Sequence, residues 1–153
     1  MNYLEQEIGR KLPMLNMAAI TARQGLHIAY HIGRTDEDLV KRARDRKEEG
    51  KGLTCSTFFS ENEANLAIWE FFNDAYALSS VTKWLEKSSD KSEKEFDYDL
   101  DSEEEYIGKV LLPNGALKKT RSFRIVLIKN EDRNGAAEMP FTIKNLYPVE
   151  EDW

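Results

Sequence analysis

The chain has 153 residues, of which 41% are hydrophobic and 33% are charged, and this balance predicts one soluble domain with a sizeable core. Its single cysteine, Cys55, excludes an intrachain disulfide, as is usual for proteins that fold in a reducing compartment. No apolar run is long enough to cross a bilayer, and residues 1–30 lack the continuous apolar core of a signal peptide. We therefore expect no membrane partner.

The net charge of −6 is unevenly distributed. Residues 90–105 contain nine carboxylates and two lysines, so this segment alone carries a charge of −7. The remainder is close to neutral, so the acidity of the whole chain gives little reason to exclude a nucleic-acid ligand. We interpret residues 90–105 as a solvated loop that leads into an edge strand. A docking surface for a basic partner is the alternative.

The first half of the sequence is predicted to be helical. An amphipathic stripe predicts a helix over residues 2–12, and an alanine-rich segment predicts a second helix over residues 14–32, which Gly33 ends. Thr35 is placed to cap a third helix that runs to about residue 47, because three acidic residues follow it in the first turn. Ser60, with a glutamate three residues later, begins a fourth helix over residues 60–85.

The second half has the period-two pattern of strands. Strands are predicted over residues 96–100, 106–112, 117–129 and 139–149, and Pro-Asn-Gly at residues 113–115 marks a turn. Helices followed by an antiparallel meander make an α+β domain.

Both histidines of the chain, His27 and His31, lie in one short segment. Histidine is the side chain whose ordinary pKa lies nearest neutrality, so acid–base chemistry by histidine would occur here. At a spacing of four residues, two histidines on a helix share a face and could bind a metal ion, but neither a third histidine nor an intervening glutamate supports that site. The alternative is that the two histidines have no chemical role and only pack at the end of a helix.

Two further positions could contribute to a site with His31. Arg42 lies about 60° from the buried stripe of its helix, where a guanidinium could point into a cleft; Arg46 competes for that role, and a surface position is the alternative. On the last strand, Asn145 and Tyr147 share a face with Phe141 and Ile143. This polar pair, roughly 7 Å apart, could form the wall of a site or mark the transition to solvent.

These segments together resemble a known family. The matching segments, in order, are 31–39, Arg42, 56–58, 63–64, 84–85, 121–129 and 145–148. They are similar to the bacterial RNase A-like toxin domains at the C-termini of contact-dependent inhibition (CdiA-type) proteins and other polymorphic toxins. The resemblance implies a single two-lobed α+β domain, RNase A-like without disulfides, with a helical segment at residues 1–24 and the family-like core at residues 25–149.

The resemblance also implies an activity and a site. It implies a metal-independent ribonuclease without a cofactor that cleaves RNA, tRNA among the candidate targets, through a 2′,3′-cyclic phosphate. The catalytic residues carried over are His31 as the base, Arg42 on the phosphorane, and the pair Asn145 and Tyr147. A Thr or Ser is more usual where Asn145 stands, and the histidine often found five residues before the catalytic one is displaced here to His27. Which group protonates the leaving oxygen stays open.

Partners and alternatives complete the predictions. Lys118, Lys119 and Arg121 could bind RNA phosphates, or could protect an exposed strand edge by charge. The resemblance implies a cognate immunity protein. It also implies that the domain is secreted or delivered by a contact-dependent system and acts in the cytoplasm of a target cell; the delivery region is either absent or belongs to a longer parent. The competing function is that of an acidic, non-enzymatic binding protein such as an immunity or inhibitor protein, suggested by residues 90–105.

Overall fold

The computed structural model describes residues 2–25, 28–48, 55–87, 92–101, 103–130 and 139–151. The elements are, in chain order, α1 (Tyr3–Lys11), η1 (Leu12–Met14), α2 (Met17–Gln24), η2 (Ile28–His31), α3 (Asp36–Glu48), β1 (Cys55–Phe58), α4 (Glu61–Asn73), α5 (Ala75–Glu86), β2 (Glu93–Asp99), β3 (Gly108–Leu111), β4 (Leu117–Thr120), β5 (Ser122–Lys129) and β6 (Phe141–Val149), where η marks a 3₁₀ helix. The predicted α+β class is confirmed. Within these ranges no helix is long and apolar enough to cross a membrane.

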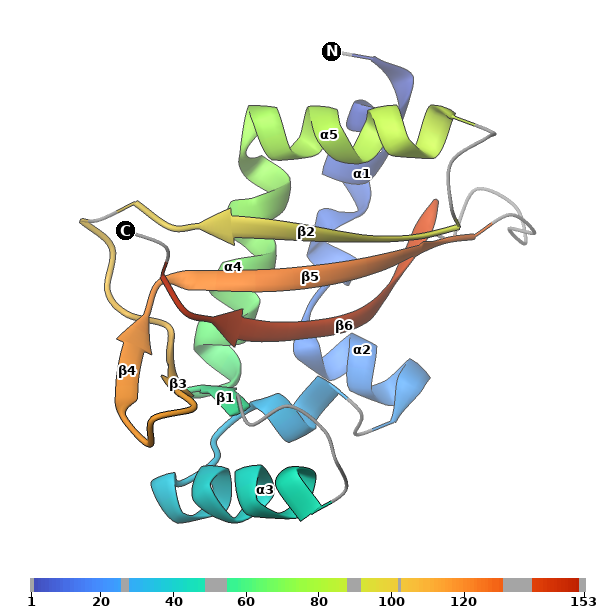
Figure 1. The fold of residues 1–153 in the computed structure, drawn as a ribbon. Helices are drawn as coiled ribbons and strands as arrows, with labels where there is room; N and C mark the ends of the chain where they lie inside the picture. The colour runs from blue at the N-terminus through green and yellow to red at the C-terminus, as the bar shows by residue number, and fades with distance from the viewer. Residues whose placement is uncertain are drawn as a thin grey trace.

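Two antiparallel sheets organise the fold (Figure 1). The larger has the strand order β2-β5-β6, and one of its faces packs with residues of α1, α4 and α5 in the main hydrophobic core. The smaller has the order β1-β3-β4 and, together with α3, forms a second hydrophobic cluster. Strand β2 pairs with β5 rather than with β3, so the predicted simple meander is wrong: the chain crosses from one sheet to the other and back.

Two predicted helices are interrupted, one by a polar cap and one by a glycine. The helix expected over residues 60–85 is two helices, because Asp74 leaves the helical conformation and its carboxylate accepts a 2.8 Å hydrogen bond from the Ala77 amide, which caps α5. Ser60 does cap α4 as predicted. The prediction of one helix over residues 14–32 is also wrong, because α2 ends at Gln24. Its C-cap is Gly25, whose φ of +77° belongs to the left-handed region that favours glycine.

The long strand predicted over residues 117–129 is split between the two sheets. Strand β4 ends at Thr120 in the smaller sheet, and β5 begins at Ser122 in the larger one. Strand β1 was missed by the sequence reasoning, because four fully buried residues are too short to show a period.

The two sheets meet at Gly108, the first residue of β3. A Cβ atom at this position would lie 2.2 Å from the Thr57 carbonyl oxygen and 2.9 Å from Cγ of Pro148. Only glycine lets β3 approach β1 and the end of β6 this closely. This contact sets where the end of β6, which carries Tyr147, stands relative to the smaller sheet.

Candidate active site

His31 ends the short helix η2 and is positioned by the backbone that follows it. Gly33, with φ of +68°, turns the chain, and its amide donates a 2.8 Å hydrogen bond to the carbonyl of Phe58 in β1. Ile32 forms an isolated bridge with the same residue. His31 therefore belongs to η2 and not to the long helix predicted over residues 14–32. His27, predicted to share a helix face with it, lies outside the described residues.

A bulge in β6 decides where Asn145 and Tyr147 point. Val126 of β5 pairs with Asn145, but the next residue of β5 pairs with Ile143, so Lys144 is an extra residue in β6. A bulge of this kind shifts the alternation of side chains by one. The prediction that residues 141, 143, 145 and 147 share one face is consequently wrong.

Burial follows the shifted register. Phe141 and Ile143 belong to the main core before the bulge, and Leu146 is buried in that core after it. Asn145 and Tyr147 are half-buried on the opposite, outer face of the large sheet. The bulge thus turns the polar pair out of the core and toward η2.

His31 contacts Tyr147 on this outer face. Their ring centroids are 5.4 Å apart with an interplanar angle of 41°, a tilted aromatic pair. Asn145, two residues before Tyr147, accepts a 2.9 Å hydrogen bond from the amide of Leu146 through its side-chain oxygen. His31 and Tyr147, which are far apart in the sequence and were predicted for one site, therefore meet at β6.

His31 and Arg42 line one cavity, between η2 and α3. Its volume is about 560 Å³. The remaining lining residues are Tyr30, Arg34, Asp38, Leu39, Lys41 and Asp45. Arg46, the competitor of Arg42, is not among them. The cavity contains more cations than carboxylates, which suits a phosphate ligand.

The first turn of α3 is held by a reciprocal cap, as predicted from Thr35. The Thr35 hydroxyl accepts a hydrogen bond from the Asp38 amide, and the Asp38 carboxylate accepts one from the Thr35 amide, each 3.1 Å long. The hydrogen bond from the Thr35 amide to the carboxylate, together with one from the Thr35 side chain, holds the pKa of Asp38 below its usual range. The cap fixes the start of the helix that carries Arg42.

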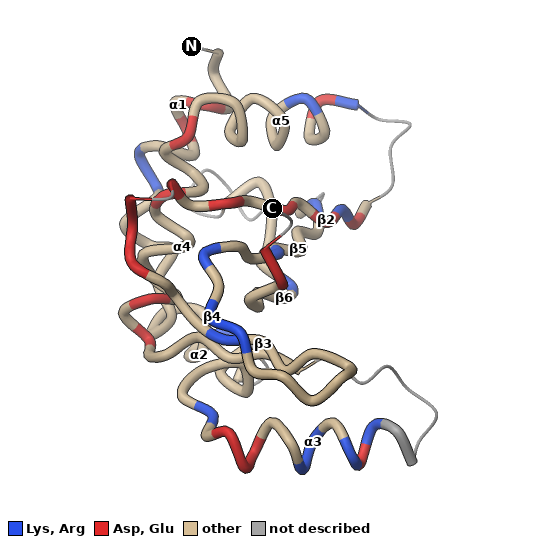
Figure 2. Tube along the Cα trace, turned by 60° about the vertical axis from the view of Figure 1, so that its left-hand side comes forward, with Lys and Arg blue, Asp and Glu red and all other residues tan. Residues whose placement is uncertain are grey.

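Lys118 and Lys119 lie exposed on β4, the edge strand of the smaller sheet (Figure 2). Lys118 Nζ is 3.8 Å from a Glu150 carboxylate oxygen. Lys119 is paired across the strands with Lys109, whose ammonium group binds Asp36 at the start of α3. The sequence reasoning missed Lys109, and only the strand register brings it beside Lys119.

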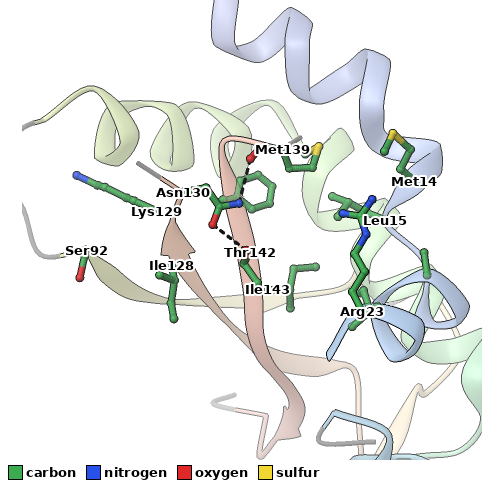
Figure 3. A pocket seen from close by; sticks show the side chains of 13 residues that line it. Met14, Leu15, Arg23, Ser92, Ile128, Lys129, Asn130, Met139, Thr142 and Ile143 are labelled. Carbon is green, nitrogen blue, oxygen red and sulfur yellow. Dashed lines mark hydrogen bonds between the residues drawn. The ribbon is translucent and has the colours of Figure 1, made fainter. Parts of the chain in front are cut away.

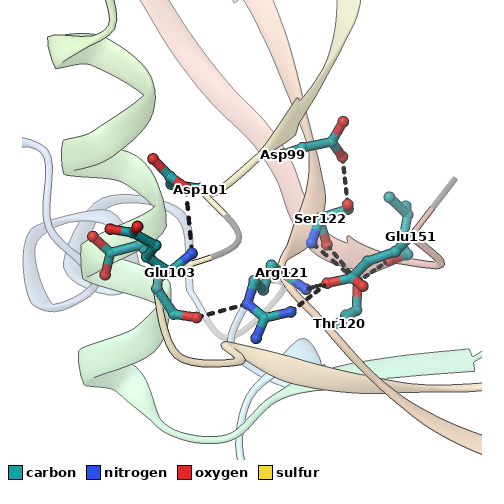
Figure 4. Close-up of polar contacts among 9 residues, drawn as sticks. Asp99, Asp101, Glu103, Thr120, Arg121, Ser122 and Glu151 are labelled. Carbon is teal, nitrogen blue, oxygen red and sulfur yellow. Dashed lines mark hydrogen bonds and ion pairs between the residues drawn. The ribbon is translucent and has the colours of Figure 1, made fainter. Parts of the chain in front are cut away.

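Arg121 is held by internal contacts, unlike the two lysines (Figure 4). Its Nε donates a 2.6 Å hydrogen bond to the Glu104 carbonyl, and its guanidinium lies 3.9 Å from the centroid of the Tyr106 ring. Glu151 accepts a hydrogen bond from its amide and lies 3.7 Å from Nη1. The side chain is 18% exposed, so the structure places it at the crossover between the sheets rather than on an open surface.

Residues Glu93–Asp99 of the acidic segment form β2, the edge strand of the large sheet. The predicted edge strand is confirmed, but it begins within the stretch that was interpreted as a solvated loop leading into it. The outward carboxylates of β2 bind cations of the other two strands: Glu93 binds Lys144 of β6, and both Glu95 and Asp97 bind Arg124 of β5. Two cations thus face these three carboxylates, and this edge of the sheet stays negative.

A second cavity, of about 600 Å³, lies at the far end of β5 and β6, beside α2 (Figure 3). Its Asn130 side chain donates to the Met139 carbonyl and accepts from the Thr142 hydroxyl, so this amide holds the strand ends together. None of the predicted catalytic residues lines it. Across the described part of the chain, no group of three or more His, Cys, Asp or Glu side chains could hold a metal ion.

Comparisons with known proteins define the class. The family model described as "Bacterial CdiA-CT RNAse A domain" matches residues 25–148. Since the match covers most of the sequence, the chain belongs to this family of bacterial CdiA-CT RNase A domains, and the predicted resemblance is confirmed.

A solved structure supports the same fold. The chain is similar to the crystal structure of a CdiA-CT/CdiI complex from Y. kristensenii, with a TM-score of 0.65 and 18% sequence identity. The similarity covers 80% of this chain and 97% of that one. A search of curated proteins found no significant match.

Proposed function

We propose that this chain is a metal-independent endoribonuclease toxin domain that cleaves RNA by internal attack of a 2′-hydroxyl. The observation that carries the proposal is the position of His31: its ring packs against Tyr147, and the residue also lines a cavity with Arg42. A base, a phosphate-binding cation and a hydroxyl donor are thus adjacent, on elements that belong to different parts of the fold.

Each residue has a chemical role in this proposal. His31 takes the proton of the 2′-hydroxyl while that oxygen forms a bond to the adjacent phosphorus. The Arg42 guanidinium donates hydrogen bonds to the phosphorane oxygens, for which its planar fork is suited. Asn145 and Tyr147 donate to the charge that develops in the transition state. The bond to the 5′-oxygen then breaks, that oxygen takes up a proton, and a 2′,3′-cyclic phosphate is left.

Charge on the surface favours one path for the RNA. The acidic residues of β2 border the outer face of the large sheet on one side and repel phosphates there. Lys118 and Lys119 on β4, with Lys41 and Arg34 at the cavity, supply cations on the other side. We assign the phosphate contacts outside the cavity to the two lysines and assign Arg121 to the scaffold.

Partners follow from the family and from the neighbouring structure. The similar chain from Y. kristensenii was crystallised as a CdiA-CT/CdiI complex, and a cognate immunity protein is the corresponding partner here. Delivery by a contact-dependent system follows from the same family, and we propose that the delivered domain acts on RNA in the cytoplasm of the target cell. The alternative of an acidic inhibitor loses support, because three carboxylates of the acidic segment bind Lys144 and Arg124 within the sheet.

The test is cleavage of total RNA and tRNA in EDTA, with His31→Ala and the matched control His27→Ala. We expect the wild type and His27→Ala to cleave RNA. The cleavage rate of His31→Ala should be lower by about 10²- to 10⁴-fold, the usual contribution of a general base. Mass spectrometry of the products should find 2′,3′-cyclic phosphate ends. Full cleavage by His31→Ala would refute the assignment of the base, and cleavage that requires added Mg²⁺ would refute metal independence.

A further inference from the structure

A row of three side chains crosses the outer face of the large sheet and ends at Tyr147. In the strand register, Asp97 of β2 is opposite Arg124 of β5, and Arg124 is opposite Tyr147 of β6. The three strands lie side by side in this order (Figure 1). Directly opposite residues on one face of a sheet are close enough for their side chains to interact.

Arg124 is held in a fixed orientation by the carboxylates of β2. Its Nε lies 2.7 Å from Asp97 Oδ1 and its Nη2 lies 3.1 Å from Asp97 Oδ2, a bidentate pair. Its Nη1 lies 3.5 Å from a carboxylate oxygen of Glu95. Hydrogen bonds to Asp97 and to Tyr147 both raise the pKa of Arg124 above its usual range. The guanidinium is therefore ordered before any substrate binds.

We propose that Arg124 is a positioning residue for Tyr147, and that Asp97 in turn orients Arg124; this inference rests on the proposed ribonuclease function. Arginine carries only donors, so in this contact the Tyr147 hydroxyl oxygen must be the acceptor. The hydroxyl hydrogen then points away from Arg124 and stays available to the reacting phosphate. His31 packs against the same ring, so the ring is held from two sides.

Arg124 is less suited to bind the substrate itself. Two carboxylates already balance its charge, and they would repel a phosphate at the same place. Its effect should therefore act on the chemical step through Tyr147. A small displacement of a group that contacts the transition state can cost about 10²-fold in rate.

The test is a double-mutant cycle on RNA cleavage, with kcat and KM measured separately. We expect Arg124→Ala to lower kcat by roughly 10- to 100-fold, with KM little changed. In a Tyr147→Phe background, Arg124→Ala should lower kcat hardly any further, because the hydroxyl that Arg124 positions is gone. Arg124→Lys, which keeps a donor, should recover part of the loss. If the fold-loss of kcat in the double variant equals the product of the losses in the two single variants, the inference is wrong.

A matched control separates positioning from general sheet stability. Lys144→Ala removes another cross-strand ion pair of this sheet, with Glu93, and should leave kcat close to that of the wild type. If Arg124→Ala loses no more activity than Lys144→Ala, the inference is wrong. Asp97→Asn keeps the shape of the partner, and is used if Arg124→Ala does not fold; unchanged kcat in that variant also overturns the inference.

A spectroscopic measurement tests the contact without activity. The ¹³Cζ resonance of Tyr147, assigned by its loss in Tyr147→Phe, should move in Arg124→Ala and stay in place in Lys144→Ala. An unmoved resonance in Arg124→Ala would overturn the inference even for an active enzyme. A wild-type protein that cleaves no RNA would instead overturn the proposed function, and the resonance would still decide the contact.

Discussion

Replacing Gly108 with alanine is expected to strain the contact between the two sheets. The added Cβ would lie 2.2 Å from the Thr57 carbonyl oxygen, 2.9 Å from Cγ of Pro148 and 3.1 Å from Cα of Phe58. Two of these three atoms belong to the backbone, so rotation of a side chain cannot relieve the overlap. The smaller sheet, the end of β6 or both must move.

Overpacking of a close contact typically costs about 1–3 kcal/mol. For a chain of this size each kcal/mol lowers Tm by roughly 2–4 °C, so we expect Tm to fall by roughly 2–12 °C. Because Pro148 follows Tyr147 directly, the same movement displaces Tyr147 relative to His31. We therefore expect RNA cleavage to decrease together with stability.

The assay is urea unfolding followed by circular dichroism, with thermal unfolding alongside. Gly9→Ala is the matched control, because Gly9 lies within α1 and an added Cβ would meet no atom within 4 Å apart from its own helix. That substitution should stabilise the protein by about 0.5–1 kcal/mol through helix propensity. If Gly108→Ala is as stable as the wild type, the inference that the two sheets are too close at this residue to accept a Cβ is wrong.

Three further predictions concern stability and RNA binding. Asp74→Ala removes the cap of α5 and should lower the free energy of unfolding by about 1 kcal/mol in urea titrations; an unchanged midpoint would contradict this role. Burial, together with the charge and hydrogen bond of Asp74, raises the pKa of Tyr98 to about 12 from a usual value of 10. The folded state therefore keeps the proton that the unfolded chain loses, and stability should fall as pH rises from about 10 to 12. Tyr98→Phe should make that fall smaller than in the wild type, and an identical pH dependence would refute the assignment. Lys118→Ala and Lys119→Ala should each reduce the slope of log K for RNA against log salt by roughly 0.7, measured by fluorescence anisotropy; an unchanged slope would remove them from the RNA path.

Local patterns in the sequence were sufficient for the elements whose causes are local. The caps at Thr35 and Ser60 were predicted from residues within a few positions of each helix start, because a cap binds amides of its own first turn. The alternation of β2 and the α+β class were likewise predicted. The family was predicted from the order and spacing of short motifs and is confirmed, while the roles of His31 and Arg42 stay proposals.

What only the tertiary structure decided depends on contacts between distant segments. The bulge at Lys144 reverses which face of β6 carries Asn145 and Tyr147, and no alternation in the sequence predicts an extra residue. Arg121 and Arg124 have the same charge and lie three residues apart. One is held at the crossover, and the other is held beside Tyr147. Strand register and packing determine these environments, so the sequence supplied the candidate side chains and the tertiary fold determined which of them meet.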